Sequence, residues 1–180
     1  MVLVYVVAVV AYTLIDRAAF ASSGAPTGRT RQEWTYWAVI VPYYACLVAP
    51  ALEIAAGTAQ PSLPGTIAGA VCICVAGWLR WVGVTTLGTS FSASVETHDE
   101  HRLVDQGVYA VIRHPLYLGL VFLYVGLPLL AGARLSWIAT VLGLIGIVIR
   151  ILAEERWLVA NLPGYSEYMR RTKRLIPAVW

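Results

Sequence analysis

The sequence contains few charged residues. Asp, Glu, Lys and Arg make up 13% of its 180 residues, whereas a soluble domain usually carries about 25%. The hydrophobic residues, 59% of the chain, occur in long blocks rather than on alternating faces, and the mean hydropathy is +0.70. This composition excludes an ordinary soluble domain and predicts an all-α integral membrane protein with several spans.

Cysteines and clustered basic residues are also scarce. Cys46, Cys72 and Cys74 all lie in apolar stretches, so we interpret them as small buried hydrophobic side chains rather than as a metal site or a disulfide framework. The net charge is +3, and no run of Lys or Arg is interleaved with aromatic residues. The sequence therefore lacks the features of a nucleic-acid-binding protein.

Five apolar segments approach the roughly 20 residues that a membrane span needs. We predict one membrane domain over residues 1–180, with three spans in residues 1–87. Residues 88–180 form a second half with two spans, a connecting loop and a basic tail. The third span contains Arg80, and the fourth is short. The five spans cover approximately residues 2–15 with an extension toward 20, 34–56, 66–87, 116–131 and 135–153.

The first apolar segment has an alternative interpretation as a signal peptide, because small residues follow it at positions 19–21. However, it has no basic N-terminal region, and Asp16 and Arg17 would separate the apolar run from the cleavage site. We therefore favour a retained span.

Basic residues alternate between the loops. Ten Lys and Arg residues lie in the first loop, the connection 88–115 and the C-terminal tail, whereas the other two loops contain only Arg134. The positive-inside rule places the basic side in the cytoplasm. We therefore predict an N-terminus outside the membrane, five crossings and a cytoplasmic C-terminus.

Two features of the loops and spans leave alternatives open. Gly65 and Gly69 form a small-xxx-small face, for which packing within the monomer is favoured over a dimer contact. The oligomeric state is left open.

His98, Asp99, Glu100 and His101 resemble a metal site in composition. Since neighbouring positions diverge on any regular element, we interpret them as a solvated turn and expect no metal.

Two polar clusters flank a predicted helical hairpin. Residues 113–119 precede the fourth span and residues 150–156 end the fifth. Charged groups beside a membrane span are costly and usually functional, and the hairpin returns the chain to the same face. We expect the clusters to meet and form one site, the alternative being two charged helix ends in the headgroup layer.

Individual residues of these clusters have expected roles. Pro115 suits the first turn of a helix whose free N–H groups favour anions, and Gly119 leaves room for a bound group. Arg150 and Glu154 are four residues apart and can pair along the helix. Glu155 then points elsewhere and is free to accept hydrogen bonds from a ligand.

A turn at Pro163-Gly164 introduces the C-terminal tail, which reads as a short basic helix. The tail can lie on the bilayer surface, attracted by anionic lipid, or fold over the site. The sequence favours neither arrangement.

Three stretches together resemble the isoprenylcysteine carboxyl methyltransferase family, especially its short five-span prokaryotic members. They are residues 102–119 with the run Arg-His-Pro-Leu-Tyr, the Glu154-Glu155 pair, and the ending from Tyr165 to Pro177. The resemblance covers approximately residues 79–177, and the first two spans carry no usable motif. Phospholipid N-methyltransferases share the His-Pro and Glu-Glu elements.

The resemblance implies an S-adenosylmethionine-dependent methyltransferase of a prokaryotic cell membrane, with a cofactor pocket open to the cytosol. The Gly-rich loop of soluble methyltransferases is absent, which agrees with a different type of pocket. Arg150 or Arg113 would hold the carboxylate of the acceptor or cofactor, and Glu154 or His114 would take a proton if the acceptor were an amine. The implied cofactor-binding residues are Leu103, Val104, Tyr109, Arg113, His114, Tyr117, Gly119, Glu154 and Glu155.

The implied reaction is carboxyl O-methylation of a lipophilic acceptor that reaches the site from the bilayer, with S-adenosylhomocysteine as the second product. The acceptor would be a prenylcysteine-like compound or another isoprenoid or lipid carboxylate. The alternatives are a lipid amine N-methyltransferase, a non-catalytic membrane module, and a reductase that uses a nicotinamide cofactor on a related helical scaffold.

Overall fold

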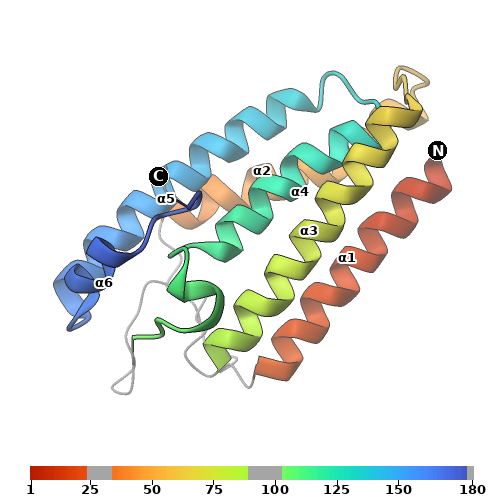
Figure 1. The fold of residues 1–180 in the computed structure, drawn as a ribbon. Helices are drawn as coiled ribbons and strands as arrows, with labels where there is room; N and C mark the ends of the chain where they lie inside the picture. Colours follow the sequence, from red (N-terminus) through yellow and green to blue (C-terminus); the bar gives the residue numbers. More distant parts are fainter. Residues whose placement is uncertain (24–33, 89–102, 178–180) are drawn as a thin grey trace.

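The computed structural model describes residues 1–23, 34–88 and 103–177 (Figure 1). These residues form helices and one isolated parallel bridge, between Ile112 and Lys173. Five helices are long, and two short ones lie near one end of the bundle. The elements are α1 (Val2–Ser23), α2 (Trp34–Ala55), α3 (Leu63–Leu87), η2 (Gly107–Ala110), α4 (Pro115–Ala131), α5 (Trp137–Asn161) and α6 (Tyr165–Arg171).

The five predicted apolar segments are all helical. Helices α1, α2, α3 and α5 are long and apolar enough to cross a membrane, and α4 is a shorter apolar helix of 17 residues. The largest difference from the prediction is the end of α5, which continues from the expected residue 153 to Asn161. Glu154, Glu155 and Arg156 have high helix propensity, so the helix extends beyond its apolar part and carries the second polar cluster.

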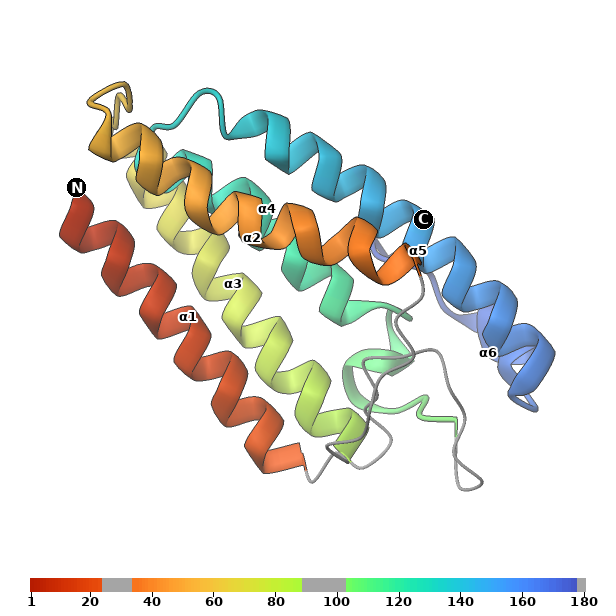
Figure 2. The same ribbon diagram turned by 180° about the vertical axis from the view of Figure 1, so that it is seen from behind.

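Helix α4 lies at the centre of the bundle and contacts each of the other long helices. It packs most extensively on α3, while α1 lies along the outer side of α3 and α2 packs on α5 (Figure 1). Helices α1 and α2 meet near the chain's N-terminus, where the Tyr5 hydroxyl donates a hydrogen bond to the Leu47 carbonyl (2.8 Å). From there they diverge toward the opposite end (Figure 2).

Glycines allow the close approach of α3 and α4. A Cβ atom on Gly126 would lie 2.9 Å from the Cβ of Cys72 and 3.0 Å from the Gly69 carbonyl oxygen. A Cβ atom on Gly69 would lie 2.7 Å from the Gly126 carbonyl oxygen. Gly69 of the small-xxx-small face therefore packs inside the monomer, which confirms the favoured interpretation.

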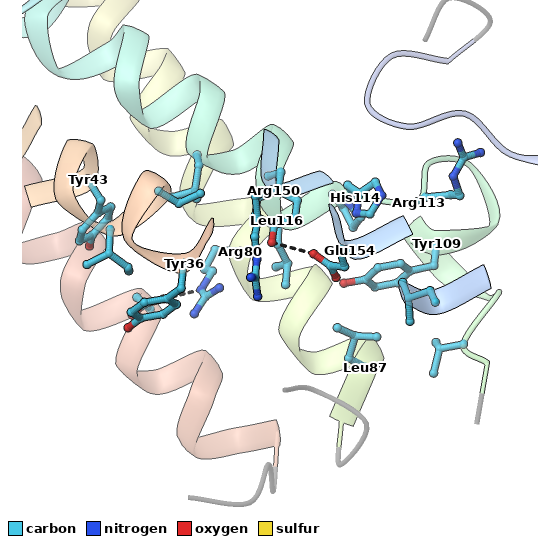
Figure 3. A pocket seen from close by; sticks show the side chains of 18 of the residues that line it. Tyr36, Tyr43, Arg80, Leu87, Tyr109, Arg113, His114, Leu116, Arg150 and Glu154 are labelled. Carbon is cyan, nitrogen blue, oxygen red and sulfur yellow. Dashed lines mark hydrogen bonds and ion pairs between the residues drawn. The ribbon is translucent and has the colours of Figure 1, made fainter. Parts of the chain in front are cut away.

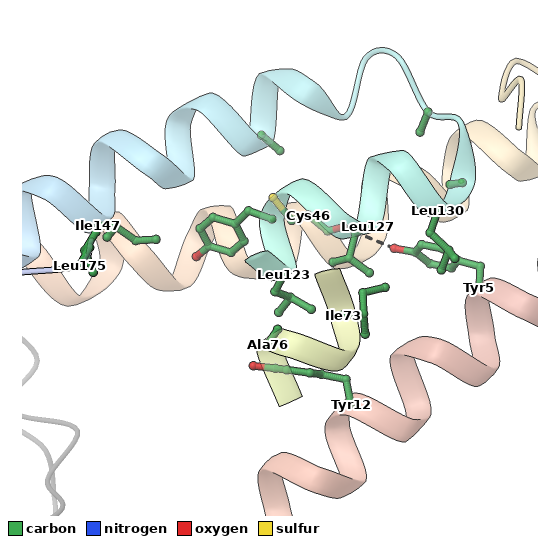
Figure 4. Close-up of a cluster of buried hydrophobic side chains, with 14 of the residues drawn as sticks. Tyr5, Tyr12, Cys46, Ile73, Ala76, Leu123, Leu127, Leu130, Ile147 and Leu175 are labelled. Carbon is green, nitrogen blue, oxygen red and sulfur yellow. Dashed lines mark hydrogen bonds between the residues drawn. The ribbon is translucent and has the colours of Figure 1, made fainter. Parts of the chain in front are cut away.

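The largest hydrophobic cluster surrounds α4 and also includes the tail. Leu123, Leu127 and Leu130 of α4 are almost completely buried, together with Ile147 of α5. Leu175, which follows α6, packs against the same cluster (Figure 4). The tail is therefore anchored in the hydrophobic interior as well as by polar contacts.

The end of the bundle opposite the two short helices is closed by a buried carboxylate. Glu53 of α2 accepts hydrogen bonds from the backbone N–H groups of Arg134 (2.8 Å), Leu135 (3.1 Å) and Ser136 (2.7 Å), and from the Ser136 hydroxyl (2.5 Å). Backbone N–H groups at the start of a helix have no intrahelical acceptor. Glu53 thus fixes the turn between α4 and α5 to α2.

We predict that Gly69→Val lowers the thermal midpoint of the detergent-solubilised protein. The added side chain overpacks the α3–α4 contact, at a cost of about 1–3 kcal/mol. Ala70→Val is the matched control, because Ala70 is exposed on α3 one residue away. Equal midpoints for the two variants would contradict the close packing of α3 and α4.

Candidate functional site

The two polar clusters meet at one end of the bundle. The Arg113 Nε donates a hydrogen bond to Glu155 Oε1 (2.8 Å), and His114 Nε2 lies 3.3 Å from the same oxygen. The Tyr117 hydroxyl donates to Glu154 Oε2 (2.7 Å). The start of α4 and the end of α5 therefore form one polar centre, as the hairpin predicted.

Helix α4 begins where Pro115 was expected to start it. His114 is non-helical, with φ −124° and ψ 58°, and Pro115 is in the first turn, because proline disfavours helical geometry in the preceding residue. The His114 side chain does not cap α4. It turns toward Glu155 instead, which places an imidazole at the polar centre.

Glu155 is a structural anchor. Its second carboxylate oxygen accepts a hydrogen bond from Arg174 Nε (2.8 Å), so Arg113, His114 and Arg174 all meet one carboxylate that is 3% exposed. The expectation that Glu155 is free to bind a ligand is wrong. A buried carboxylate is costly unless it has several donors, and this chain provides those donors itself.

Arg113 joins the tail to the polar centre. Its guanidinium donates to the carbonyl oxygens of Met169 (3.1 Å) and Thr172. The backbone N–H groups of Arg113 and His114 donate to the carbonyls of Lys173 (2.8 Å) and Arg174 (3.0 Å). Of the two arrangements left open for the tail, the structure has the one in which the tail folds over the site.

These elements enclose a cavity of about 630 Å³ (Figure 3). Helices α1 to α5, η2 and α6 all contribute to its wall. The predicted site residues that border it are Leu103, Val104, Tyr109, Arg113, His114, Tyr117, Arg150 and Glu154.

Two predicted site residues lie outside this wall. Glu155 is turned into the network with Arg113 and Arg174 described above. A Cβ atom on Gly119 would lie 3.3 Å from the Ala76 carbonyl oxygen and 3.4 Å from the Leu79 Cβ, so α3 fills the space beside this glycine. Gly119 therefore allows close helix packing, and the expected room for a bound group is absent.

One half of the cavity lies beside η2 and α6 and is mainly apolar and aromatic. Its wall includes Leu103, Val104 and Leu162. The Tyr168 hydroxyl donates a hydrogen bond to the Tyr109 carbonyl (2.7 Å). Burial raises the pKa of Tyr168 to about 12 and raises the pKa of Tyr165 and Tyr109, so these phenols remain neutral near pH 7.

The opposite half is lined by α1, α2 and α3 and was not predicted from motifs. Asp16 of α1 forms an ion pair with Arg80 of α3, and both border the cavity. The signal for this half was present in the sequence, because charged residues inside apolar spans indicate function. Four tyrosines line the same half, namely Tyr12, Tyr36, Tyr43 and Tyr44.

Arg150 and Glu154 lie between the two halves. Arg150 Nη1 donates a hydrogen bond to the Thr35 hydroxyl (2.6 Å), and the arginine is 4% exposed. Figure 3 shows Arg150 and Glu154 between the side with Tyr36 and Tyr43 and the side with Tyr109. Opposite charges thus border the centre of the cavity.

The polar cluster at positions 98–101 lies outside the described residues. Within residues 1–23, 34–88 and 103–177, no group of three or more His, Cys, Asp and Glu side chains is placed to hold a metal ion.

Residues 69–160 match the model of the isoprenylcysteine carboxyl methyltransferase (ICMT) family. The chain belongs to this family. Its apolar helices and the family match make it an integral membrane protein. The matched segment covers most of α3, all of α4 and α5 up to residue 160. The ICMT-family match therefore includes the polar centre but excludes α1, α2 and α6.

Curated relatives agree with this assignment. The chain is 33% identical over 118 residues to a protein-S-isoprenylcysteine O-methyltransferase of Saccharomyces cerevisiae. This match covers 63% of this chain and 49% of the relative. It is 32% identical over 116 residues to the Schizosaccharomyces pombe protein of that name, covering 59% and 47%. A probable enzyme of this type from Oryza sativa is 29% identical over 115 residues, covering 62% and 60%. The matches thus span about half to three fifths of these relatives.

A solved structure shares the fold. It is the structure of a eukaryotic intramembrane Ras methyltransferase ICMT, with a TM-score of 0.57 and 24% identity. The similarity covers 78% of this chain and 52% of the other. This ICMT-family chain therefore has the membrane fold of that protein over most of its length.

We predict that Glu155→Gln loosens the tail. The substitution leaves the buried Arg113 guanidinium without its anionic partner, at a cost of about 3–5 kcal/mol. Faster hydrogen exchange at residues 165–177 and a lower thermal midpoint are the expected results. Asp105→Asn is the control, because the Asp105–Arg171 pair (3.3 Å) is exposed and exposed pairs contribute little. Unchanged exchange in Glu155→Gln would show that the carboxylate does not hold the tail.

Proposed function

We propose that this protein is an S-adenosylmethionine-dependent methyltransferase that methylates the carboxylate of a lipophilic acceptor. The acceptor would be a prenylcysteine-like compound or another isoprenoid or lipid carboxylate. The observation that carries the proposal is one cavity with an apolar aromatic half, a charged centre and a second half bordered by both α1 and α2. Family membership supports it.

The residues beside η2 and α6 fit the proposed cofactor. Leu103, Val104 and Leu162 provide apolar surface for an adenine ring, and the Glu154 carboxylate at the edge of this half can accept hydrogen bonds from hydroxyl or ammonium groups. When bound, S-adenosylmethionine supplies an electrophilic methyl group whose transfer to a carboxylate oxygen leaves a neutral thioether and requires no proton movement.

The chain's own contribution is alignment and exclusion of water. A carboxylate is ionised near pH 7, so the acceptor needs no general base. Arg80 and Arg150 both border the cavity, and an Arg guanidinium binds a carboxylate through paired hydrogen bonds. Arg113 is assigned a positioning role, because its guanidinium is already bound by Glu155 and two tail carbonyls. Enclosure by the tail reduces water around the opposite charges.

The acceptor would reach the site from the bilayer. Helices α1 and α2 are hydrogen-bonded to each other near Tyr5 and Leu47. They diverge toward the end of the bundle that contains the two short helices (Figure 2). Ile40 and Leu47 of α2 line the cavity on this side. A lipophilic chain can stay in lipid between the two helices while its polar end reaches Arg80.

The runner-up function is N-methylation of a lipid amine. The observation that favours it is the Glu154 carboxylate at the centre of the cavity, which could take the proton that an ammonium must lose. Labelled methyl transfer separates the two functions, because an ester is base-labile and a methylamine is stable. We expect a base-labile product from an S-farnesylcysteine acceptor and no labelled phosphatidylethanolamine.

We predict that purified protein binds S-adenosylhomocysteine in calorimetry and that Glu154→Gln weakens this binding about tenfold, since hydrogen bonds to charged groups contribute about 1.5–3 kcal/mol. Glu167→Gln, at an exposed position of α6, is the matched control and should bind like the wild type. Absence of binding at millimolar ligand would refute both methyltransferase functions and favour a non-catalytic module.

We propose an N-terminus outside the membrane and a cytoplasmic C-terminus, because the basic loops and the tail lie on one side of the predicted spans. A reporter that is active only in the cytoplasm should be active when fused after Trp180, and a reporter that is active only in the periplasm should be inactive there. Activity of a periplasmic reporter at the same position would reverse the orientation.

A further inference from the structure

The Thr35 hydroxyl of α2 is hydrogen-bonded to Arg150, one of the two arginines that suit an acceptor carboxylate. Arg150 Nη1 donates to this hydroxyl over 2.6 Å, although the two residues are 115 positions apart in the chain. Thr35 is 3% exposed and Arg150 is 4% exposed. Buried polar groups depend on such partners, because a buried donor that loses its acceptor is costly. The contact therefore fixes the conformation of the arginine side chain.

Helix α2 is packed tightly on α5 beside this hydrogen bond. Pro42 lies inside α2 and has no N–H to donate to the Ala38 carbonyl one turn before it. Gly146 of α5 packs at that carbonyl, where an added Cβ atom would clash with the oxygen and lie 2.8 Å from the carbonyl carbon. On α2, Ala38 is three residues after Thr35, and on α5 the arginine is four residues after Gly146. Residues at these spacings share a helix face, so both contacts belong to one interface.

A further contact fixes the same part of α2. The hydroxyl of Tyr124, a buried residue of α4, donates a hydrogen bond to the Val39 carbonyl (3.0 Å). The first two turns of α2 are thus held by α4 and α5 together. They carry Thr35 and also three residues of the cavity wall, namely Tyr36, Val39 and Ile40. A helix end supported in this way can hold a ligand-binding side chain precisely.

The contact holds the guanidinium against the half of the cavity opposite the proposed cofactor surface. Helix α2 lines this opposite half, whereas Glu154, one turn further along α5, is bonded to Tyr117 of α4. A threonine hydroxyl is neutral, so this contact orients the guanidinium without neutralising it. Paired hydrogen bonds between an arginine and a carboxylate require a fixed guanidinium plane.

We propose, on the basis of the proposed function, that Thr35 is a positioning residue for the acceptor. Its hydroxyl holds the Arg150 guanidinium in the orientation that binds the acceptor carboxylate. Thr35 acts through the arginine and need not touch the acceptor itself. Because the family match begins at residue 69, this role gives α2 a part in acceptor binding that the matched segment does not contain.

Kinetics with N-acetyl-S-farnesylcysteine and labelled S-adenosylmethionine test the proposal on the whole protein. Thr35→Val keeps the side-chain shape and removes the hydroxyl. It should raise the acceptor KM about tenfold, the order of effect of one hydrogen bond to a charged group. Its Kd for S-adenosylhomocysteine in calorimetry should be unchanged, whereas Glu154→Gln is expected to weaken that binding. Thr35→Ser, which retains a hydroxyl, should restore the acceptor KM.

Thr85→Val is the matched control. The Thr85 hydroxyl is exposed and donates to the Trp81 carbonyl within α3 (2.7 Å), so its removal should change neither the acceptor KM nor the Kd for S-adenosylhomocysteine. A merely structural role of Thr35 would weaken acceptor and cofactor binding together, and the difference between the two ligands separates that role from positioning.

A second comparison uses an Arg150→Met background, in which Thr35→Val leaves no buried guanidinium without its partner. Calorimetry with N-acetyl-S-farnesylcysteine and protein saturated with S-adenosylhomocysteine should show weak acceptor binding in Arg150→Met. Adding Thr35→Val should weaken it little further, because residues that act through one another have non-additive effects.

Three results would overturn the proposal: an unchanged acceptor KM in folded Thr35→Val, equal losses of affinity for both ligands, or additive losses in the Arg150→Met background. Methyl transfer by the wild type would leave the proposed function intact in each case. If the wild type neither binds S-adenosylhomocysteine nor transfers a methyl group, the proposed function and this inference both fail.

Discussion

The structure depends on the carboxylate of Glu155. This group lies where α4, α5 and the tail meet, and it is surrounded by Arg113, His114 and Arg174. A lone carboxylate in an apolar interior would be strongly unfavourable, and so would each buried cation without it. The charges are therefore stable only together, which brings three distant parts of the sequence to one point. The cavity wall beside η2 and α6 exists because that point is fixed.

A buried carboxylate with several hydrogen-bond donors stabilises each end of the bundle, and the two carboxylates hold different segments. Glu53 at one end satisfies three backbone N–H groups and a hydroxyl, and thus closes the turn between α4 and α5. Glu155 at the other end contacts the side chains of Arg113, His114 and Arg174 and holds the tail. Both are buried carboxylates with several donors. Between them, α4 is packed on all sides, and the glycines at positions 69 and 126 allow α3 to approach it closely.

The sequence was sufficient to predict the helices and the meeting of the two polar clusters, because apolar length determines spans and a hairpin returns the chain to its starting side. It was insufficient for Glu155, since the contact with Arg174 depends on how the tail folds back after the turn at Gly164. Gly119 was also misinterpreted, because local sequence does not reveal that α3 lies against it. Asp16 and Arg80 are 64 residues apart, and only the packing of α1 on α3 brings them together.

The position of Arg174 has a consequence for biosynthesis. Glu155 precedes Arg174 along the chain, so the carboxylate has its full set of donors only after the tail has folded back onto α4. The cavity wall beside α6 is completed only when the segment containing Thr172 to Leu175 has been released and folds back onto α4. A message truncated shortly before that segment would yield an inserted helical bundle with an incomplete binding chamber.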